Sequence, residues 1–184
     1  AYIGNSTTKE TRSLALDATK LVFENIQVAY NDGKNQKARA NMLKAAYKAG
    51  LAFSKSYVGY IHAVAHSLGG QYNIPHGLAN SVLMPYVLES YGKCIHKKLK
   101  DLAIAAGIAM ESDSKEEAAN NFIRAIRQMN KEMGIPEKLQ GIKKEDIKTM
   151  AKHAAQEANP LYPVPKLMNA KQLEKFYYNV MEEK

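Results

Sequence analysis

The chain has 184 residues, which is enough for one domain with a buried core. It contains no run of about 20 apolar residues, the length that a membrane-spanning helix needs, and no signal-peptide pattern, so we expect no membrane partner. Its single cysteine, Cys94, cannot form an intrachain disulfide, which predicts a reducing, cytoplasmic setting.

The formal net charge of +8 raises the alternative of a non-enzymatic, basic helical module that binds nucleic acid. Such a module would need clustered arginines on one helix to read DNA. Only Arg124 and Arg127 lie close together, and the lysines are dispersed among acidic residues. The pattern is more typical of solvated helix faces, so we expect no nucleic-acid partner.

Helical periodicity dominates the first third of the chain. Glu10 lies at capping-box distance from Thr7, and the helix that follows is expected to end near residues 31–33. A long second helix is predicted from Asn35 to Leu68, with many small residues that suggest a central helix closely packed by its neighbours. The pair Gly69–Gly70 is its expected terminator.

The rest of the chain also predicts helices. Pro75 excludes helical geometry at Ile74, so the third helix should begin after His76, with a kink or an early turn at Pro85. Further helices are expected to end at Gly107, to run from the cap at Ser112–Ser114 to Gly134, from Lys144 to Asn159–Pro160, and from Asn169 to about Glu182. Since no alternating strand pattern and no glycine-rich phosphate loop is present, we predict a single all-α, bundle-like domain over residues 1–184, with about six to eight helices.

Three of the five histidines lie within residues 62–76, namely His62, His66 and His76. Neutral imidazole is the commonest metal ligand and a general acid or base near neutral pH. His62 and His66 are four residues apart and should share one face of the long helix, so spacing alone favours these two as a metal-binding pair. The alternative is that such histidines are satisfied core residues.

This window resembles the signature of the iron-containing alcohol dehydrogenases. The matching residues are His62-Ala-Val-Ala-His66-Ser-Leu-Gly-Gly, followed by Ile74-Pro-His-Gly-Leu-Ala-Asn80. Further matching segments are Gly50–Ser54, Gly134–Pro136 and Asn159–Pro163, the last with leucine where the family often has arginine. The resemblance covers nearly the whole chain.

The resemblance implies that residues 1–184 are a fragment of a larger two-domain enzyme. Family members have an amino-terminal α/β domain for the nicotinamide cofactor and a helical, dehydroquinate synthase-like domain for metal and substrate. They hold the metal with one aspartate and three histidines. Two of these ligands belong to an Asp-x3-His motif that directly precedes an Ala-Tyr pair similar to Ala1-Tyr2. The chain is therefore expected to be the carboxy-terminal metal and substrate domain, inactive in isolation.

By the same resemblance, His62 and His76 are the metal ligands, which replaces the pairing that spacing favoured. His66 is assigned a catalytic and cofactor-binding position beside the metal, where it relays protons or orients the nicotinamide; the alternative is a packing histidine. Phe53 is expected to line the substrate pocket; the alternative is a plain core phenylalanine.

The implied activity is oxidation of a small alcohol, or reduction of an aldehyde, with NAD or NADP. The resemblance implies a divalent metal, with iron(II) as the first choice. Zinc is the alternative, because three imidazoles and a carboxylate suit both ions. A zinc enzyme similar to glycerol dehydrogenase is the alternative within the superfamily. A homo-oligomer is expected.

Overall fold

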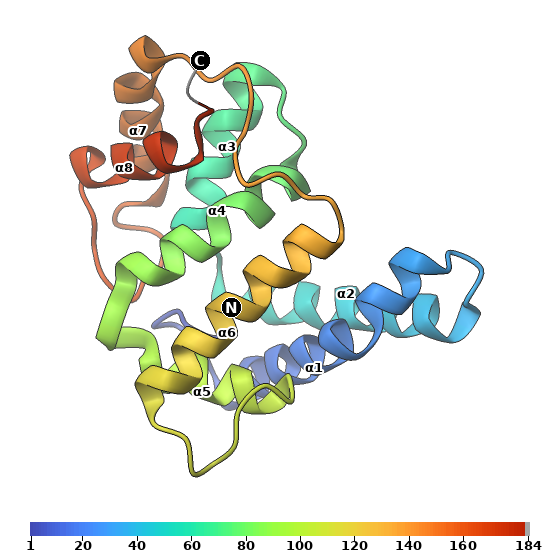
Figure 1. Ribbon diagram of the computed structural model, residues 1–184. Coiled ribbons are helices and arrows are strands. Elements are labelled where there is room, and N and C mark those ends of the chain that lie inside the picture. Colours follow the sequence, from blue (N-terminus) through green and yellow to red (C-terminus); the bar gives the residue numbers. More distant parts are fainter. Residues whose placement is uncertain (183–184) are drawn as a thin grey trace.

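The computed structural model describes residues 1–182 and confirms the all-α prediction (Figure 1). Within this part of the chain, the only strand-like pairing is an isolated bridge between Leu139 and Met181. The helices are α1 (Lys9–Asn31), α2 (Gln36–Ser56), α3 (Tyr60–Tyr72), α4 (His76–Tyr91), the 3-10 turn η1 (Gly92–Ile95), α5 (His96–Ala105), α6 (Lys115–Glu132), α7 (Lys144–Ala158) and α8 (Ala170–Val180).

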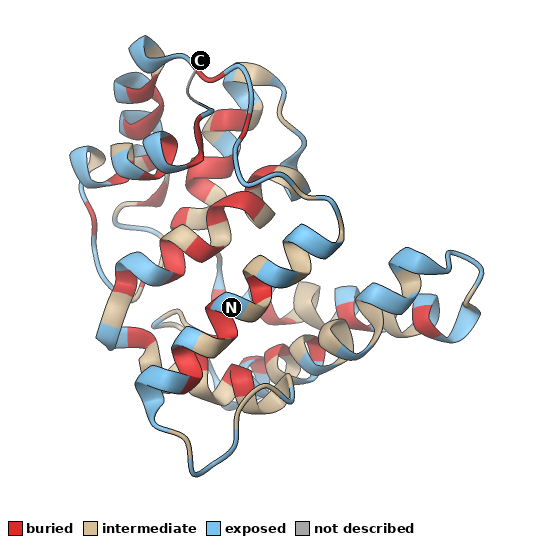
Figure 2. Cartoon of the chain, in the orientation of Figure 1, coloured by how far each residue is buried: buried red, intermediate tan, exposed pale blue. Residues whose placement is uncertain are grey.

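Helices α1 and α2 form an antiparallel hairpin that projects from the rest of the molecule (Figure 1). The buried residues of α2 include Ala38, Ala45 and Ala52, which recur every seven residues and form a narrow stripe of small side chains against α1. The far end of the hairpin is largely exposed (Figure 2). The prediction of a central second helix is therefore wrong: the small residues serve close packing between two helices, not burial on all sides.

The single long helix predicted from Asn35 to Leu68 is also wrong, because the chain breaks between α2 and α3. Tyr57 adopts a φ of 62°, and Gly59 is extended and precedes the first turn of α3. A left-handed tyrosine interrupts the helical path and redirects the chain. His62 and His66 nevertheless lie together on α3.

The expected terminator Gly69–Gly70 lies inside α3, which continues to Tyr72. The helix ends at Asn73, whose φ of 54° is left-handed and whose N–H donates to the Gly69 carbonyl. Asparagine tolerates this conformation better than most residues, so it replaces glycine as the terminating residue.

Helix α4 continues through Pro85 to Tyr91, so the early turn expected at this proline does not occur. The predicted caps Ser114 and Asn169 are confirmed. At the start of α1 the cap is Thr8 instead of Thr7: its Oγ1 accepts from the Thr11 N–H and its own N–H donates to Thr11 Oγ1.

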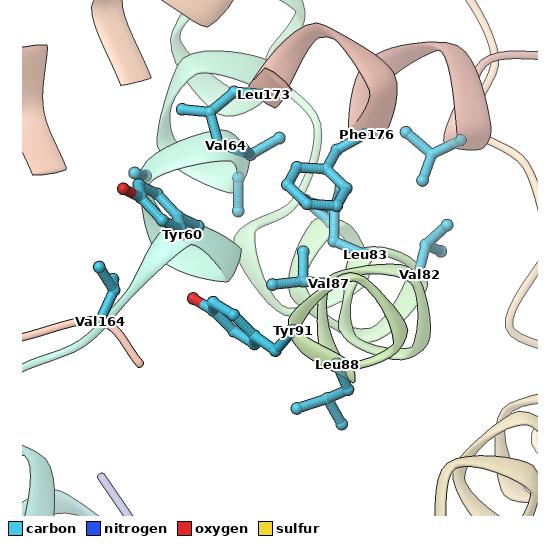
Figure 3. Close-up of a cluster of buried hydrophobic side chains, with 14 of the residues drawn as sticks. Tyr60, Val64, Val82, Leu83, Val87, Leu88, Tyr91, Val164, Leu173 and Phe176 are labelled. Carbon is cyan, nitrogen blue, oxygen red and sulfur yellow. The ribbon is translucent and has the colours of Figure 1, made fainter. Parts of the chain in front are cut away.

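The principal core lies where α3 and α4 meet α7 and α8 (Figure 3). Tyr60, at the first position of α3, is fully buried in it. Its hydroxyl donates to Asn159 Oδ1 at 2.8 Å and accepts from the Met168 N–H at 2.8 Å. These bonds attach α3 to the carboxy-terminal segment two residues before His62, so the core holds the histidine-bearing helix in place.

Truncation of this core should be costly. Leu83 on α4 is fully buried among the side chains shown in Figure 3. We expect Leu83→Ala to lower the free energy of unfolding by about 2–5 kcal/mol, because it removes apolar contacts and leaves a cavity. Urea denaturation followed by circular dichroism measures the change. Leu43→Ala on α2 is the matched control, because Leu43 is 74% exposed; equal losses in the two variants would contradict the core assignment.

Candidate metal and substrate site

The three histidines of residues 62–76 come together in space. The ring centroids of His62 and His76 are 5.4 Å apart, those of His62 and His66 are 5.9 Å apart, and those of His66 and His76 are 5.2 Å apart. His62 is half-buried, whereas His66 and His76 are exposed. The cluster therefore combines a shielded side with a side open to solvent.

Two local features of the chain produce this convergence. Residues four apart on α3 place His62 and His66 on one face. The left-handed Asn73 and the extended Pro75 then return the chain, so that His76 opens α4 beside α3. Asn80, one turn further along α4, lies 2.9 Å from His76 Nε2 through its Nδ2, while its buried Oδ1 has no partner within residues 1–182.

The chemistry of this cluster fits the nitrogen part of a divalent-metal site. Burial, together with the nearby positive charges of His76 and His66, lowers the pKa of His62 to about 4. His62 is thus a neutral imidazole at neutral pH, which is the form that binds a metal. Within residues 1–182, however, no group of three or more His, Cys, Asp or Glu side chains has the arrangement to hold a metal ion.

A carboxylate that sequence reasoning missed contacts the cluster. Glu157, near the end of α7, has its Oε1 at 2.7 Å from His66 Nδ1. The Tyr162 hydroxyl donates to the same oxygen at 2.7 Å. Because a carboxylate only accepts hydrogen bonds, Nδ1 of His66 carries the proton and Nε2 is left for other partners. Glu157 stands 91 residues from His66, so no local pattern indicated this contact.

Tyr162 is well suited to hold this carboxylate. Its partial burial, its hydrogen bond to Glu157 and the Glu157 charge raise the pKa of Tyr162 to about 12. The phenol therefore stays protonated and remains a donor at neutral pH. Tyr162 lies in the segment Asn159–Pro163 that was matched by sequence, although that match assigned it no role.

Phe53 lines a cavity that His62 also lines, and it is not a core phenylalanine. It is 47% exposed and lines a cavity of about 550 Å³, together with Tyr57 and His62. The left-handed backbone of Tyr57 thus occurs at the edge of this cavity. A strained residue at a cavity is a frequent companion of a binding site. The position of Phe53 is that of a pocket-lining aromatic side chain.

The amino terminus also reaches the site. Ala1 lines the same cavity, and the charge of its amino group lowers the pKa of His62 further. Tyr2 anchors this segment by donating to Asp101 at 2.8 Å, and Lys98 donates to the carbonyls of Ile3 and Gly4. Any residues attached ahead of Ala1 would therefore approach the cavity next to His62.

The remaining candidate residues lie outside the cluster. Cys94 is an exposed free thiol whose Sγ donates to the Tyr91 carbonyl. His96 begins α5, and His153 is exposed on α7 beside a separate polar hollow. Neither histidine contributes to the metal-binding candidate.

Comparison with known proteins agrees with the all-α fold. Residues 1–181 match the family model described as "Fe-containing alcohol dehydrogenase family, C-terminal". The chain is 40% identical to alcohol dehydrogenase 4 of Saccharomyces cerevisiae over 162 residues. The aligned region covers 86% of this chain and 41% of that protein. It is 36% identical to 1,3-propanediol dehydrogenase of Citrobacter freundii over 179 residues. This aligned region covers 96% of this chain and 46% of that protein.

Solved structures show the same similarity. The crystal structure of a 1,3-propanediol oxidoreductase superposes with a TM-score of 0.92 at 33% identity, over 98% of this chain and 47% of that one. This chain belongs to the iron-containing alcohol dehydrogenase family, and its helices correspond to the carboxy-terminal domain of that family. It spans about half the length of the relatives it matches. None of the helices within residues 1–182 is long and apolar enough to cross a membrane.

Proposed function

We propose that this chain is the metal- and substrate-binding half of an alcohol dehydrogenase that uses a divalent metal and NAD or NADP. The observation that carries the proposal is the convergence of the His62, His66 and His76 rings, of which His62 also lines a largely apolar cavity. Membership of the family, whose relatives are alcohol and diol dehydrogenases, supports the reaction class.

In this proposal His62 and His76 would hold the metal through their ring nitrogens, and further ligands would come from residues ahead of Ala1. When bound, the ion acts as a Lewis acid toward the alcohol oxygen. In the overall reaction the carbinol carbon loses a hydride to NAD(P)⁺ and the hydroxyl loses a proton, which yields an aldehyde or ketone and NAD(P)H. The chain itself must then orient the alcohol, exclude water from its tail and carry the proton away.

His66 is suited to proton transfer in this proposal. Glu157 holds Nδ1, so Nε2 is the nitrogen that can accept the proton from the alcohol side. The His66 side chain is 43% exposed, and the proton can therefore pass from the ring to bulk water. The wall formed by Phe53 and the apolar cavity would exclude water from the substrate tail.

Several finer assignments belong to the same proposal. We propose iron(II) as the physiological metal with zinc as the alternative, a small alcohol or aldehyde as the ligand, and a cytoplasmic homo-oligomer that has no nucleic-acid partner. Size-exclusion chromatography with light scattering measures the oligomer. A salt-dependent DNA shift assay tests the basic binding module, and a shift at physiological salt would favour that alternative.

The proposal predicts metal-dependent turnover in the full-length protein that carries this chain. Purified metal-free protein, reconstituted with iron(II) under anaerobic conditions or with zinc, should form NADH or NADPH from primary alcohols. Removal of the ion with a chelator should reduce the rate by at least about a thousandfold, because the Lewis acid contributes several kcal/mol to transition-state stabilisation. Turnover that resists chelation, or none with either metal and either cofactor, would overturn the proposal.

A further inference from the structure

Glu157 lies in the last turn of α7, where helix electrostatics do not favour a carboxylate. The carboxy-terminal end of a helix carries a partial negative charge, so an acidic side chain there destabilises the helix. The last turn of α7 contains no basic residue that would offset this effect. Helix stability therefore does not account for an acidic residue at this position, and the contacts of the carboxylate do.

The Glu157 carboxylate joins two side chains from different parts of the chain. A single oxygen, Oε1, accepts hydrogen bonds from His66 Nδ1 on α3 and from the Tyr162 hydroxyl, each at 2.7 Å. Tyr162 is itself held, because its backbone N–H donates to the Ala158 carbonyl at 2.7 Å and so keeps the segment after α7 at the end of that helix. Hydrogen bonds to an ionised acceptor are roughly twice as strong as neutral ones. The phenol thus fixes the oxygen that His66 binds.

The His66 ring needs such a partner to adopt one defined state. Its side chain is 43% exposed, and it stacks on His76 with ring centroids 5.2 Å apart and ring planes 22° apart. Stacking restrains the plane of a ring, but it does not select which edge faces which way or which nitrogen carries the proton. An acceptor at Nδ1 selects both. It favours the tautomer with the proton on Nδ1, and it fixes the direction of the unprotonated Nε2 across the ring.

We infer that Glu157, held by Tyr162, is a positioning residue for the dehydrogenase reaction, because it fixes His66 in the orientation and tautomer in which Nε2 can accept a proton. This inference rests on the proposed function for the role of His66. It goes beyond that function because it assigns roles to two residues outside the histidine window and predicts a ring state that exists without metal or substrate. Neither Glu157 nor Tyr162, both in the described part of the chain, lines the cavity beside His62. Both therefore act through His66.

Loss of the carboxylate should slow the reaction without weakening alcohol binding. In the full-length, metal-loaded protein we expect Glu157→Ala to lower the single-turnover rate of NAD(P)H formation about tenfold or more, because a positioned base contributes about a hundredfold and a wrongly protonated one contributes little. The alcohol concentration that gives half the maximal rate should stay within about twofold, because Glu157 does not touch the cavity. Stopped-flow measurement of the nicotinamide absorbance gives both quantities.

The matched control is Glu145→Ala, which makes the same substitution at an exposed position in the first turn of the same helix. Its single-turnover rate should stay within about twofold, as is usual for surface substitutions. Tyr162→Phe removes only the hydroxyl and should lower the rate by about two- to tenfold, which corresponds to one hydrogen bond. Glu157→Gln serves if Glu157→Ala does not fold. Its amide keeps the size of the side chain but can pair with Nδ1 as a donor or as an acceptor, so it no longer selects one tautomer.

A second readout does not depend on turnover. In the metal-free, full-length protein with ¹⁵N-labelled histidine rings, NMR at about pH 8, where imidazole is neutral, should show His66 with a protonated Nδ1 and an unprotonated Nε2. The signal is assigned by its absence from His66→Gln. Glu157→Ala should convert it to a mixture of tautomers, whereas Glu145→Ala should leave it unchanged.

The two readouts separate this inference from the proposed function. If the protein shows the expected tautomer and its loss in Glu157→Ala but oxidises no alcohol, Glu157 is supported as the residue that sets the ring state, and the proposed function is refuted. If the His66 tautomer is unchanged in Glu157→Ala, or if Glu157→Ala and Glu145→Ala have equal single-turnover rates, the inference is refuted and the proposed function stands.

Discussion

Replacement of His62 by alanine in the full-length protein is expected to abolish metal retention and to lower kcat/KM for alcohols by about a thousandfold or more. His62 is the half-buried member of the histidine cluster, and its lowered pKa keeps the ring neutral and ready to donate its lone pair. Loss of one imidazole leaves the ion under-coordinated. Loss of the ion removes its stabilisation of the developing alkoxide, which is worth several kcal/mol. Metal analysis of dialysed protein by mass spectrometry and the rate of NAD(P)H formation measure the two effects.

The control for this prediction is His153→Ala, which removes an exposed imidazole on α7 outside the cluster. This variant should keep its metal and its rate. The His62→Ala variant should also keep its circular dichroism spectrum, because the core around Tyr60 and Leu83 is unchanged. If the purified His62→Ala protein retained one ion per chain and near-normal turnover, the assignment of His62 as a ligand would be wrong.

The isolated 184-residue chain is expected to show no measurable alcohol oxidation, whichever metal and nicotinamide are added. The family resemblance gives this chain only two of the four metal ligands and no nicotinamide domain, and it spans about half the length of its relatives. Two imidazoles leave a divalent ion held largely by water, and its binding should be weak. Without a bound nicotinamide there is no hydride acceptor held at the carbinol carbon.

This second prediction is measured by adding NAD or NADP, iron(II) or zinc and a panel of primary alcohols to the purified chain. The full-length protein under the same conditions is the positive control. Calorimetric titration with zinc should give a dissociation constant at least about a hundredfold weaker than that of the full-length protein. Chelator-sensitive turnover by the 184-residue chain would show that it holds a complete site, and the placement of the missing ligands ahead of Ala1 would then be incorrect.

Local patterns were sufficient to predict the helical class and most helix ends. The caps Ser114 and Asn169 and the helix end at Asn159–Pro160 depend on a few neighbouring residues, and the structure confirms them. Caps and breakers act through bonds within one turn, so their signals are readable in sequence. The break at Tyr57 was not readable, because a left-handed tyrosine is unfavourable by itself and persists only where surrounding packing imposes it.

The candidate site also has a part that could be predicted from sequence and a part that could not. Sequence indicated His62, His66 and His76 because they lie within one short window, and family resemblance, rather than spacing, selected the pair His62 and His76. Phe53 was also named from sequence, but its location at the edge of a cavity is a property of the folded chain.

What only the tertiary structure decided is the part of the site that joins distant segments. Glu157 meets His66 across 91 residues because α7 packs on α3, and the cavity beside His62 is formed by residues from all of the helices α1 to α6. An isolated glutamate near the end of a helix has no distinguishing pattern of its own. Residue type and near-neighbour spacing determine which atoms can do chemistry, whereas contacts between helices far apart in the chain determine which of those atoms meet and how much space is left for a ligand.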